Sequence, residues 1–242
     1  MSRIRFWSGL TFCLLGIALL LGLGTWQMER LHWKEGLIAR IESRIHSTPE
    51  SLAKIRALEN ETGDVDYRPV TVSGRFLHEG EAFILSTYDG QAGWNVFTPL
   101  LTGDNDLVFV NRGFVPYDMR DPKTRTEGQI SGSVTFDGVA RNAPSEKPGY
   151  FVPDSDSETR TFFWRDLDGI AGGLTLEEHV SLLPFFIDAG AETPWGPYPI
   201  GGQTQVTITN NHLQYAITWY GLAFVLIVMT GMLIHRYGRR TP

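Results

Sequence analysis

A histidine stands immediately before a long uncharged stretch near the C-terminus of the chain. A neutral imidazole is a common axial ligand of haem iron, so His212 is a candidate haem ligand. On a helix with 100° per residue, small residues on its face would leave a shallow recess for a flat apolar macrocycle. The alternative is a helix cap at a membrane boundary, where polar and aromatic residues are common. The residues on or beside this face are Tyr215, Ala216, Trp219 and Ala223.

A second uncharged stretch, near the N-terminus, ends in a similar set of polar and aromatic side chains. Trp26 and Gln27 lie at its end, so we add them to the predicted site around His212. His32 follows closely and is a candidate second ligand, although an exposed interfacial position is the interpretation we favour. The remaining histidines are interpreted as ordinary domain residues, or as part of a basic flank in the case of the last: His46, His78, His179 and His235.

Other residue patterns give no catalytic constellation. The sequence contains no Gly-x-Ser-x-Gly elbow, His-Glu-x-x-His motif, P-loop or dinucleotide fingerprint. Asp154, Asp156 and Glu158 begin like a calcium loop, but Thr159 stands where such a loop needs glycine. We interpret this segment as a solvated acidic loop. The single cysteine, Cys13, excludes a disulfide framework and any Cys-x-x-Cys motif.

Two uncharged apolar runs, residues 6–28 and 213–234, must position the candidate site. Crossing a bilayer takes roughly 20 apolar residues, so each run predicts a transmembrane helix. A cleavable signal peptide is the alternative for the first run, but its length and the lack of an Ala-x-Ala-type site favour a retained helix. Gly9, Cys13 and Gly16 form a face of small residues, which favours close packing on the second run or on another membrane protein.

The charge pattern predicts the orientation of these helices. The chain has a formal net charge of -6, which argues against nucleic acid as a partner, yet its two tails are basic. Basic flanks stay in the cytoplasm, so both termini are predicted to be cytoplasmic and the middle domain periplasmic. The chain shows no transit peptide, which favours a bacterial inner membrane. The basic tail residues are Arg3, Arg5, Arg236, Arg239 and Arg240.

The middle of the chain predicts an antiparallel β-rich domain, a barrel or a sandwich. From Tyr67 onward apolar and polar residues alternate with period two, and Gly, Pro, Asp and Asn clusters separate about eight short runs. The fold class is therefore α+β, with two transmembrane helices flanking this domain. We expect the boundaries 1–28, 29–211 and 212–242. The runs after the first are Ala82–Tyr88, Trp94–Leu101, Leu107–Phe114, Gly132–Ala140, Thr161–Leu167, Leu183–Ala189 and Thr204–Thr209.

Three helices are predicted around the β runs. Apolar residues at helical spacing over Leu31–Ile45 predict that the first span continues as an amphipathic helix. Thr48 followed by Pro49 predicts the start of a second helix. Thr175 with Glu178 forms a capping box that predicts a third.

Several strings together resemble the surfeit locus protein 1 family over nearly the whole chain. Phe114 is a mild departure, because that family usually has tryptophan there. The matching strings, in chain order, are Gly24-Thr25-Trp26-Gln27, Arg30-Leu31-x-Trp33-Lys34, Tyr67-Arg68-Pro69-Val70, Gly74-x-Phe76, Gly93-Trp94-x-Val96-x-Thr98-Pro99-Leu100, Val110-Asn111-Arg112-Gly113-Phe114-Val115-Pro116, and Asn211-His212-Leu213-Gln214-Tyr215-Ala216-x-Thr218-Trp219-Tyr220.

The resemblance implies an assembly factor for haem–copper cytochrome c oxidase rather than an enzyme. It further implies haem a as a transiently bound group with His212 as the axial ligand of its iron. The implied partners are the oxidase catalytic subunit and membrane lipids, with the haem a synthesis machinery as a further candidate. Two alternatives remain: a haem-free scaffold for an immature oxidase subunit, and an enzyme acting on haem or lipid, which no acid–base pair or nucleophile supports.

Overall fold

The structure, a computed structural model, describes residues 3–204 and 209–239 and divides the chain into two units. One unit contains Met1–Ile41 and Thr207–Pro242, and the other contains Glu42–Val206. Because the two units are not placed relative to one another, each is described by itself.

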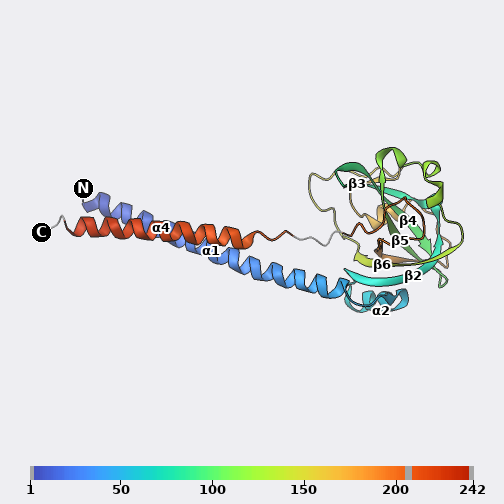
Figure 1. Cartoon of the computed structure of the whole chain (residues 1–242), viewed down its shortest axis with the longest axis horizontal. Helices are drawn as coiled ribbons and strands as arrows, with labels where there is room; N and C mark the ends of the chain where they lie inside the picture. Colours follow the sequence, from blue (N-terminus) through green and yellow to red (C-terminus); the bar gives the residue numbers. More distant parts are fainter. Residues whose placement is uncertain (1–2, 205–208, 240–242) are drawn as a thin grey trace. The chain divides into compact units, whose positions relative to one another are not determined.

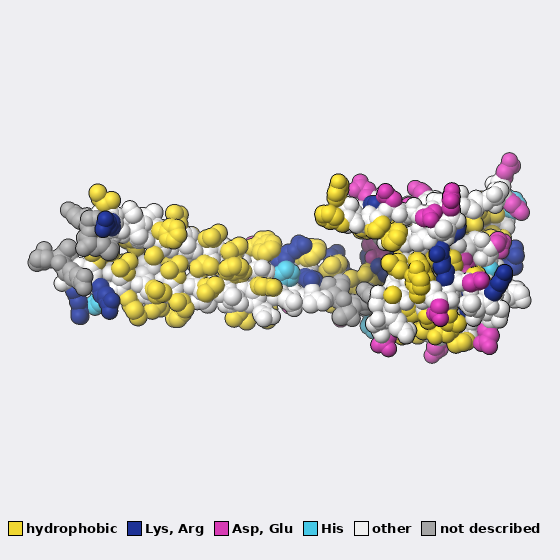
Figure 2. Space-filling view, turned by 90° about the horizontal axis from the view of Figure 1, so that it is seen from above, with side chains coloured by type: hydrophobic (Ala, Val, Ile, Leu, Met, Phe, Trp, Pro, Cys, Tyr) yellow, Lys and Arg dark blue, Asp and Glu magenta, His cyan; other side chains and the backbone are white. Residues whose placement is uncertain are grey.

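The first unit is an antiparallel helix pair. Helix α1 (Arg3–Ile45) and helix α4 (His212–Gly238) lie side by side (Figure 1). Both are long and apolar enough to cross a membrane, and hydrophobic side chains are spread along the face of the pair that Figure 2 shows. The rings of Phe6 and Tyr237 stack with centroids 3.7 Å apart at one end of the pair. The helix predicted over Leu31–Ile45 is confirmed as an unbroken continuation of α1.

The two helices pack through small residues. The buried positions of α4 are Ala216, Ala223 and Thr230, which recur every seven residues, as in a left-handed helix pair. On α1, a Cβ atom at Gly24 would lie 2.7 Å from the ring of Tyr220, so only glycine fits there without a shift. Of the predicted small-residue face on α1, Gly16 packs against Leu226 of α4. Gly9 meets nothing within 4 Å.

The second unit is a five-stranded β barrel with added strands and short helices (Figure 1). The strand order is β1-β2-β6-β8-β5-β4-β3-β7, and an additional pairing between β2 and β4 closes β2, β6, β8, β5 and β4 into a ring. The expected α+β fold with two flanking apolar helices is confirmed. The strands are β1 (Glu50–Ser51), β2 (Arg68–Phe76), β3 (Ala82–Tyr88), β4 (Gln91–Leu101), β5 (Asp106–Pro116), β6 (Ser133–Asn142), β7 (Thr161–Phe162) and β8 (Ser181–Ala189).

Most neighbouring strands are antiparallel, but three pairs run parallel: β1 with β2, β3 with β7, and β5 with β8. Strand β2 alternates as predicted, with Val70 and Val72 buried and Thr71 and Ser73 facing outward. Strand β5 is buried at nearly every position because the sheet carries an apolar cluster on each face. Val108 and Val110 belong to the barrel core, while Phe109 belongs to the cluster outside it.

Two predicted helix starts are wrong. Pro49 does not begin a helix, because Glu50 pairs with Val70 of β2. Helix α2 (Leu52–Thr62) begins after Ser51, whose hydroxyl accepts from the Lys54 backbone N–H. The capping box at Thr175 starts no helix, because β8 begins at Ser181 and leaves room for only a single turn.

The predicted strand Thr161–Leu167 is confirmed only at Thr161–Phe162. It stops because the Asp166 side chain caps helix α3 (Leu167–Ala171) by accepting from the Gly169 N–H at 3.0 Å. In the run predicted over Thr204–Thr209, residues 205–208 lie outside the described residues, and neither end residue is in a strand. Short 3-10 turns complete the domain: η1 (His78–Gly80), η2 (Tyr117–Met119), η3 (Pro122–Thr124) and η4 (Thr126–Gly128).

Candidate functional site

The candidate site lies where α4 begins beside α1. His212 is the first residue of α4, and its ring Nδ1 lies 2.7 Å from Oε1 of Gln27 on α1. Both side chains are half-buried. The backbone N–H of His212 also donates to the side chain of Asn210 at 3.4 Å. Two residues predicted from depth alone are thus in direct contact.

The contact with Gln27 decides what the imidazole can do. Oε1 of Gln27 can only accept, so Nδ1 of His212 is the donor, and in the neutral imidazole Nε2 is then the nitrogen with a lone pair for a metal. Histidines that bind metals almost always donate their other ring N–H in this way, which fixes both tautomer and ring orientation. The arrangement therefore fits the donor chemistry of an axial iron ligand.

The surroundings of His212 are only partly as predicted. Trp26 and Tyr215 are 53% and 54% exposed, and Trp219 is half-buried. The expected open recess is wrong, because Ala216 is 1% exposed and Ala223 is fully buried in the helix pair. The small side chains on α4 let α1 pack closely against it, so no open recess remains there for a ligand.

Polar contacts reinforce this end of the helix pair. Thr25 Oγ1 lies 3.2 Å from the hydroxyl of Tyr220, and Lys34 donates to the backbone carbonyl of Thr209 just before α4. His32 is exposed and lies about 140° around α1 from Gln27 at 100° per residue. The guanidinium of Arg30 lies 4.1 Å from the ring centroid of Trp33.

The acidic loop predicted in the β domain is held by its own contacts. Asp156 accepts from the backbone N–H groups of Glu158 and Thr159, and Asp154 pairs with Lys147 at 2.8 Å. Within the described part of the chain, no group of three or more His, Cys, Asp or Glu side chains could hold a metal ion.

Sequence reasoning missed a buried ionic cluster in the barrel. Glu81 is 5% exposed, and Arg112 and Arg125 both pair with its carboxylate. The guanidinium of Arg112 also lies 4.8 Å and 4.9 Å from the ring centroids of Phe76 and Trp195. The motif Val110-Asn111-Arg112-Gly113 gave a signal, because a charged residue inside an otherwise apolar strand needs a buried partner.

The pKa values in this cluster show that its buried groups stabilise one another in their charged forms. Burial would raise the pKa of Glu81, but His78 and Arg125 beside it outweigh burial and hold that pKa at about 2. Burial lowers the pKa of Arg112 to about 10, so both groups stay charged at neutral pH. Gln129 adds a further hydrogen bond to Glu81 at 3.2 Å.

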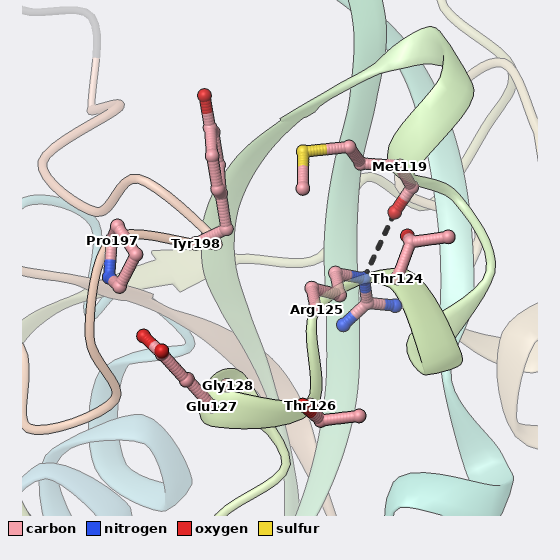
Figure 3. Close-up of a pocket in the computed structure, with 8 residues that line it drawn as sticks. All are labelled: Met119, Thr124, Arg125, Thr126, Glu127, Gly128, Pro197 and Tyr198. Atoms are coloured by element: carbon pink, nitrogen blue, oxygen red, sulfur yellow. Dashed lines mark hydrogen bonds between the residues drawn. The ribbon is translucent and has the colours of Figure 1, made fainter.

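A pocket of about 280 Å³ opens beside this cluster (Figure 3). Arg125 lines it, together with Met119, Glu127 and Tyr198. The Arg125 guanidinium is already engaged, because Nε donates to the Met119 carbonyl at 3.1 Å and the two Nη atoms donate to Glu81. The Arg125 guanidinium therefore has little hydrogen-bonding capacity left for a ligand in this pocket.

The fold and the site define a class of protein: a chain with a β-barrel domain and two long apolar helices, in which a histidine at the start of the second helix is held by a glutamine of the first. The family model described as the SURF1 family matches residues 14–224. The chain therefore belongs to the SURF1 family, a family of cytochrome c oxidase assembly factors that is not catalytic.

Relatives in several eukaryotes agree with this assignment. The chain is 36% identical to a SURF1-like protein of Monosiga brevicollis over 97% of this chain and 91% of the relative. It is 38% identical to surfeit locus protein 1 of Rattus norvegicus, over 91% and 73% of the two chains. The corresponding protein of Homo sapiens is 39% identical, over 84% of this chain and 69% of its own.

Proposed function

We propose that this chain assists the assembly of haem–copper cytochrome c oxidase by holding haem a at the membrane surface and passing it to the catalytic subunit. The observation that carries the proposal is the 2.7 Å contact between His212 Nδ1 and Gln27 Oε1, which leaves Nε2 as the ligand atom. Haem a is the cargo in this proposal, and the chain performs no chemistry on it.

The roles of the individual side chains follow from their positions. His212 holds the iron through Nε2, and Gln27 orients the imidazole. Trp26 and Tyr215 are exposed next to this pair and supply aromatic surface for an apolar ring. Ala216 acts indirectly, because its small side chain lets α1 approach α4.

A site of this kind suits transfer better than storage. Haem a is apolar, so handing it over at the membrane avoids its passage through water. A single protein ligand at a shallow position releases its cargo more readily than an enclosed pocket with two ligands. We infer that the haem a synthesis machinery donates the cargo and that the oxidase catalytic subunit receives it.

The proposed topology places both termini in the cytoplasm and the barrel domain in the periplasm of a bacterium. It rests on the basic residues that flank the two spans, including Arg5 and Arg236. Accessibility of single introduced cysteines to a membrane-impermeant maleimide tests it, in a Cys13→Ser background. Labelling of intact spheroplasts at residue 150 but not at residue 239 is the expected result, and the reverse pattern would contradict the topology.

The test of haem binding is the optical spectrum of the detergent-purified chain after coexpression with haem a synthesis. We expect a reduced haem a band in the wild type and its loss in His212→Ala. His235→Ala is the matched control, because it removes a histidine from the opposite end of the same helix. Gln27→Leu should keep the band position but lower haem occupancy about 10- to 100-fold at limiting haem.

Two outcomes would contradict the proposal. If the wild type contains no haem although haem a is abundant, the scaffold alternative takes its place, and copurified oxidase subunit becomes the measurement of choice. If His212→Ala and His235→Ala retain the same haem content, another residue supplies the ligand.

A further inference from the structure

A second pocket, of about 360 Å³, lies in the β domain on the outer face of the barrel wall. Along β8, Phe185 and Ile187 point into the barrel core, so Asp188 points to the opposite face with Phe186. Arg141 alternates in the same way with the core residue Ala140. The pocket is lined almost entirely by polar groups: Tyr67, Ser86, Thr87, Asn95, Arg141 and Arg165.

The floor of this pocket is a fixed chain of alternating charges. Asp66 accepts from Arg141 at 2.7 Å, and Arg141 donates in turn to Asp188 at 3.2 Å. Asp188 then accepts from Arg165 at 2.8 Å. Asp188 is fully buried and also accepts from Asn111 at 3.0 Å, which holds both arginines in place.

The chain of charges ends on Arg165, whose guanidinium has one nitrogen without a partner in the described part of the chain. Nη1 of Arg165 is buried, and among the described residues it has no hydrogen-bond partner. The side-chain oxygen of Asn95, which lines the same pocket, is in the same condition. Buried polar atoms in native proteins are nearly always paired, so such atoms at a pocket indicate a missing partner. The missing partner of a guanidinium N–H is an acceptor, preferably an anionic one.

The charge balance narrows the class of anion. The formal charges in this chain sum to zero over Asp66, Arg141, Asp188 and Arg165. A ligand with a single negative charge on Arg165 would therefore continue the alternation of charges. A doubly charged phosphate would place excess negative charge next to the buried Asp188. Ser86, Thr87 and Asn95 supply hydroxyl and amide groups for further hydrogen bonds. The volume falls within the range of pockets that hold small organic molecules.

We propose that this pocket binds a small organic acid, with its carboxylate on Arg165 and its hydroxyl or amide groups on the side chains of β3 and β4. The site is separate from the haem site and does not depend on the proposed transfer of haem a.

The experiment is isothermal titration calorimetry on the full chain in detergent, at neutral pH and constant ionic strength, with glycerate, inorganic phosphate and glycerol as probes. We expect glycerate, a singly charged hydroxy acid, to bind, and phosphate and glycerol to bind at least tenfold more weakly. Arg165→Lys keeps a positive charge beside Asp188 but removes the second donor, so glycerate should bind at least tenfold more weakly. Arg56→Gln is the matched control, because Arg56 pairs with Asp106 away from this pocket.

A second variant guards against loss of folding. Thr87→Val changes an exposed lining residue outside the charge chain, and it should weaken glycerate binding a few-fold while leaving the unfolding midpoint unchanged. The proposal is overturned if the wild type does not bind glycerate, or if phosphate binds more tightly than glycerate. It also fails if Arg165→Lys binds glycerate as the wild type does, or if a short acidic peptide binds where glycerate does not.

Discussion

The β domain and the helix pair bury polar groups in opposite ways. The barrel buries Glu81, Arg112 and Arg125 together, and their charges are engaged with one another and with the backbone. In the helix pair, the buried residues of α4 are Ala216, Ala223 and Thr230, and two side-chain hydrogen bonds join the helices near the start of α4. Those bonds are Thr25 with Tyr220 and Gln27 with His212.

The difference follows from the two environments. In lipid, helices gain little from apolar burial, so close packing of small residues holds them together. Polar groups there are costly and usually mark function. In the barrel, by contrast, removing one member of a buried ionic cluster leaves the others uncompensated. Buried charge therefore maintains the fold in the domain, whereas polar contact in the helix pair marks the candidate site.

The largest expected effect comes from breaking the barrel cluster. Glu81→Gln leaves Arg112 and Arg125 without their carboxylate and should lower the free energy of unfolding of the β domain by about 3–5 kcal/mol. Urea unfolding of the full chain in detergent, followed by tryptophan fluorescence, measures it. Glu177→Gln makes the same chemical change at an exposed pair with His179 and should cost less than about 0.5 kcal/mol. Equal effects of the two variants on the free energy of unfolding would contradict a structural role of the cluster.

Acid should reveal the same cluster in the wild type. The pKa of Glu81 is about 2 in the folded protein against an ordinary 4.5. Its contribution to the free energy of unfolding is therefore complete above pH 4.5 and is lost as the pH falls toward 2. A difference of that size corresponds to about 3 kcal/mol. Unfolding curves between pH 6 and pH 2.5 should show this loss, and Glu81→Gln should reduce it. Asp64, whose pKa Arg44 also holds at about 2, adds a smaller part because it is half-exposed.

A smaller effect is expected from crowding the helix pair. Gly24→Val places a side chain against the ring of Tyr220 and should weaken helix packing by about 1–3 kcal/mol. A bifunctional cysteine cross-linker between Phe6→Cys and Tyr237→Cys, in a Cys13→Ser background, reports the packing in detergent. Gly22→Val is the control, because a Cβ there meets nothing within 4 Å. In the Gly24 variant, both the cross-linking yield and the haem content should fall. A change in the Gly22 control alone would contradict the packing described.

The smallest effect is expected from a single hydrogen bond at the site. Thr25→Val removes the hydroxyl that lies 3.2 Å from Tyr220 and should cost about 0.6 kcal/mol of helix association. The same cross-linking assay, repeated at increasing concentrations of a denaturing detergent, measures this loss of helix association. Thr218→Val serves for comparison, because the Thr218 hydroxyl donates within its own helix, to the Gln214 carbonyl. A larger loss in the comparison variant would place the weak point of the pair elsewhere.

The elements predicted best are those that a local pattern specifies fully. The lack of charge over residues 6–28 and 213–234 was enough to predict α1 and α4, and the alternation from Val70 was enough for β2. The starts predicted at Pro49 and Thr175 were wrong because strand pairing decided those segments. Strand β5 pairs in parallel with β8, and no local signal encodes that pairing.

The candidate site was predicted in composition but not in geometry. Depth in the membrane placed His212 and Gln27 at the same level, but it could not specify a 2.7 Å contact between them. The recess predicted at Ala216 was wrong because a helical wheel shows one helix without its partner. The pocket at Arg165 was not predicted, because its residues come from separate strands and loops.

The segment that follows β8 is held against the barrel wall at Ile200. Phe114 and Ile200 exchange two backbone hydrogen bonds, of 2.9 Å and 2.8 Å, across an antiparallel bridge. The bridge exists because Gly113 lacks a side chain, whose Cβ would lie 1.8 Å from the Ile200 carbonyl oxygen. Any side chain at residue 113 would therefore push Ile200 away from β5 and break both hydrogen bonds. Gly113 thus decides whether the segment around Ile200 stays paired with the barrel wall.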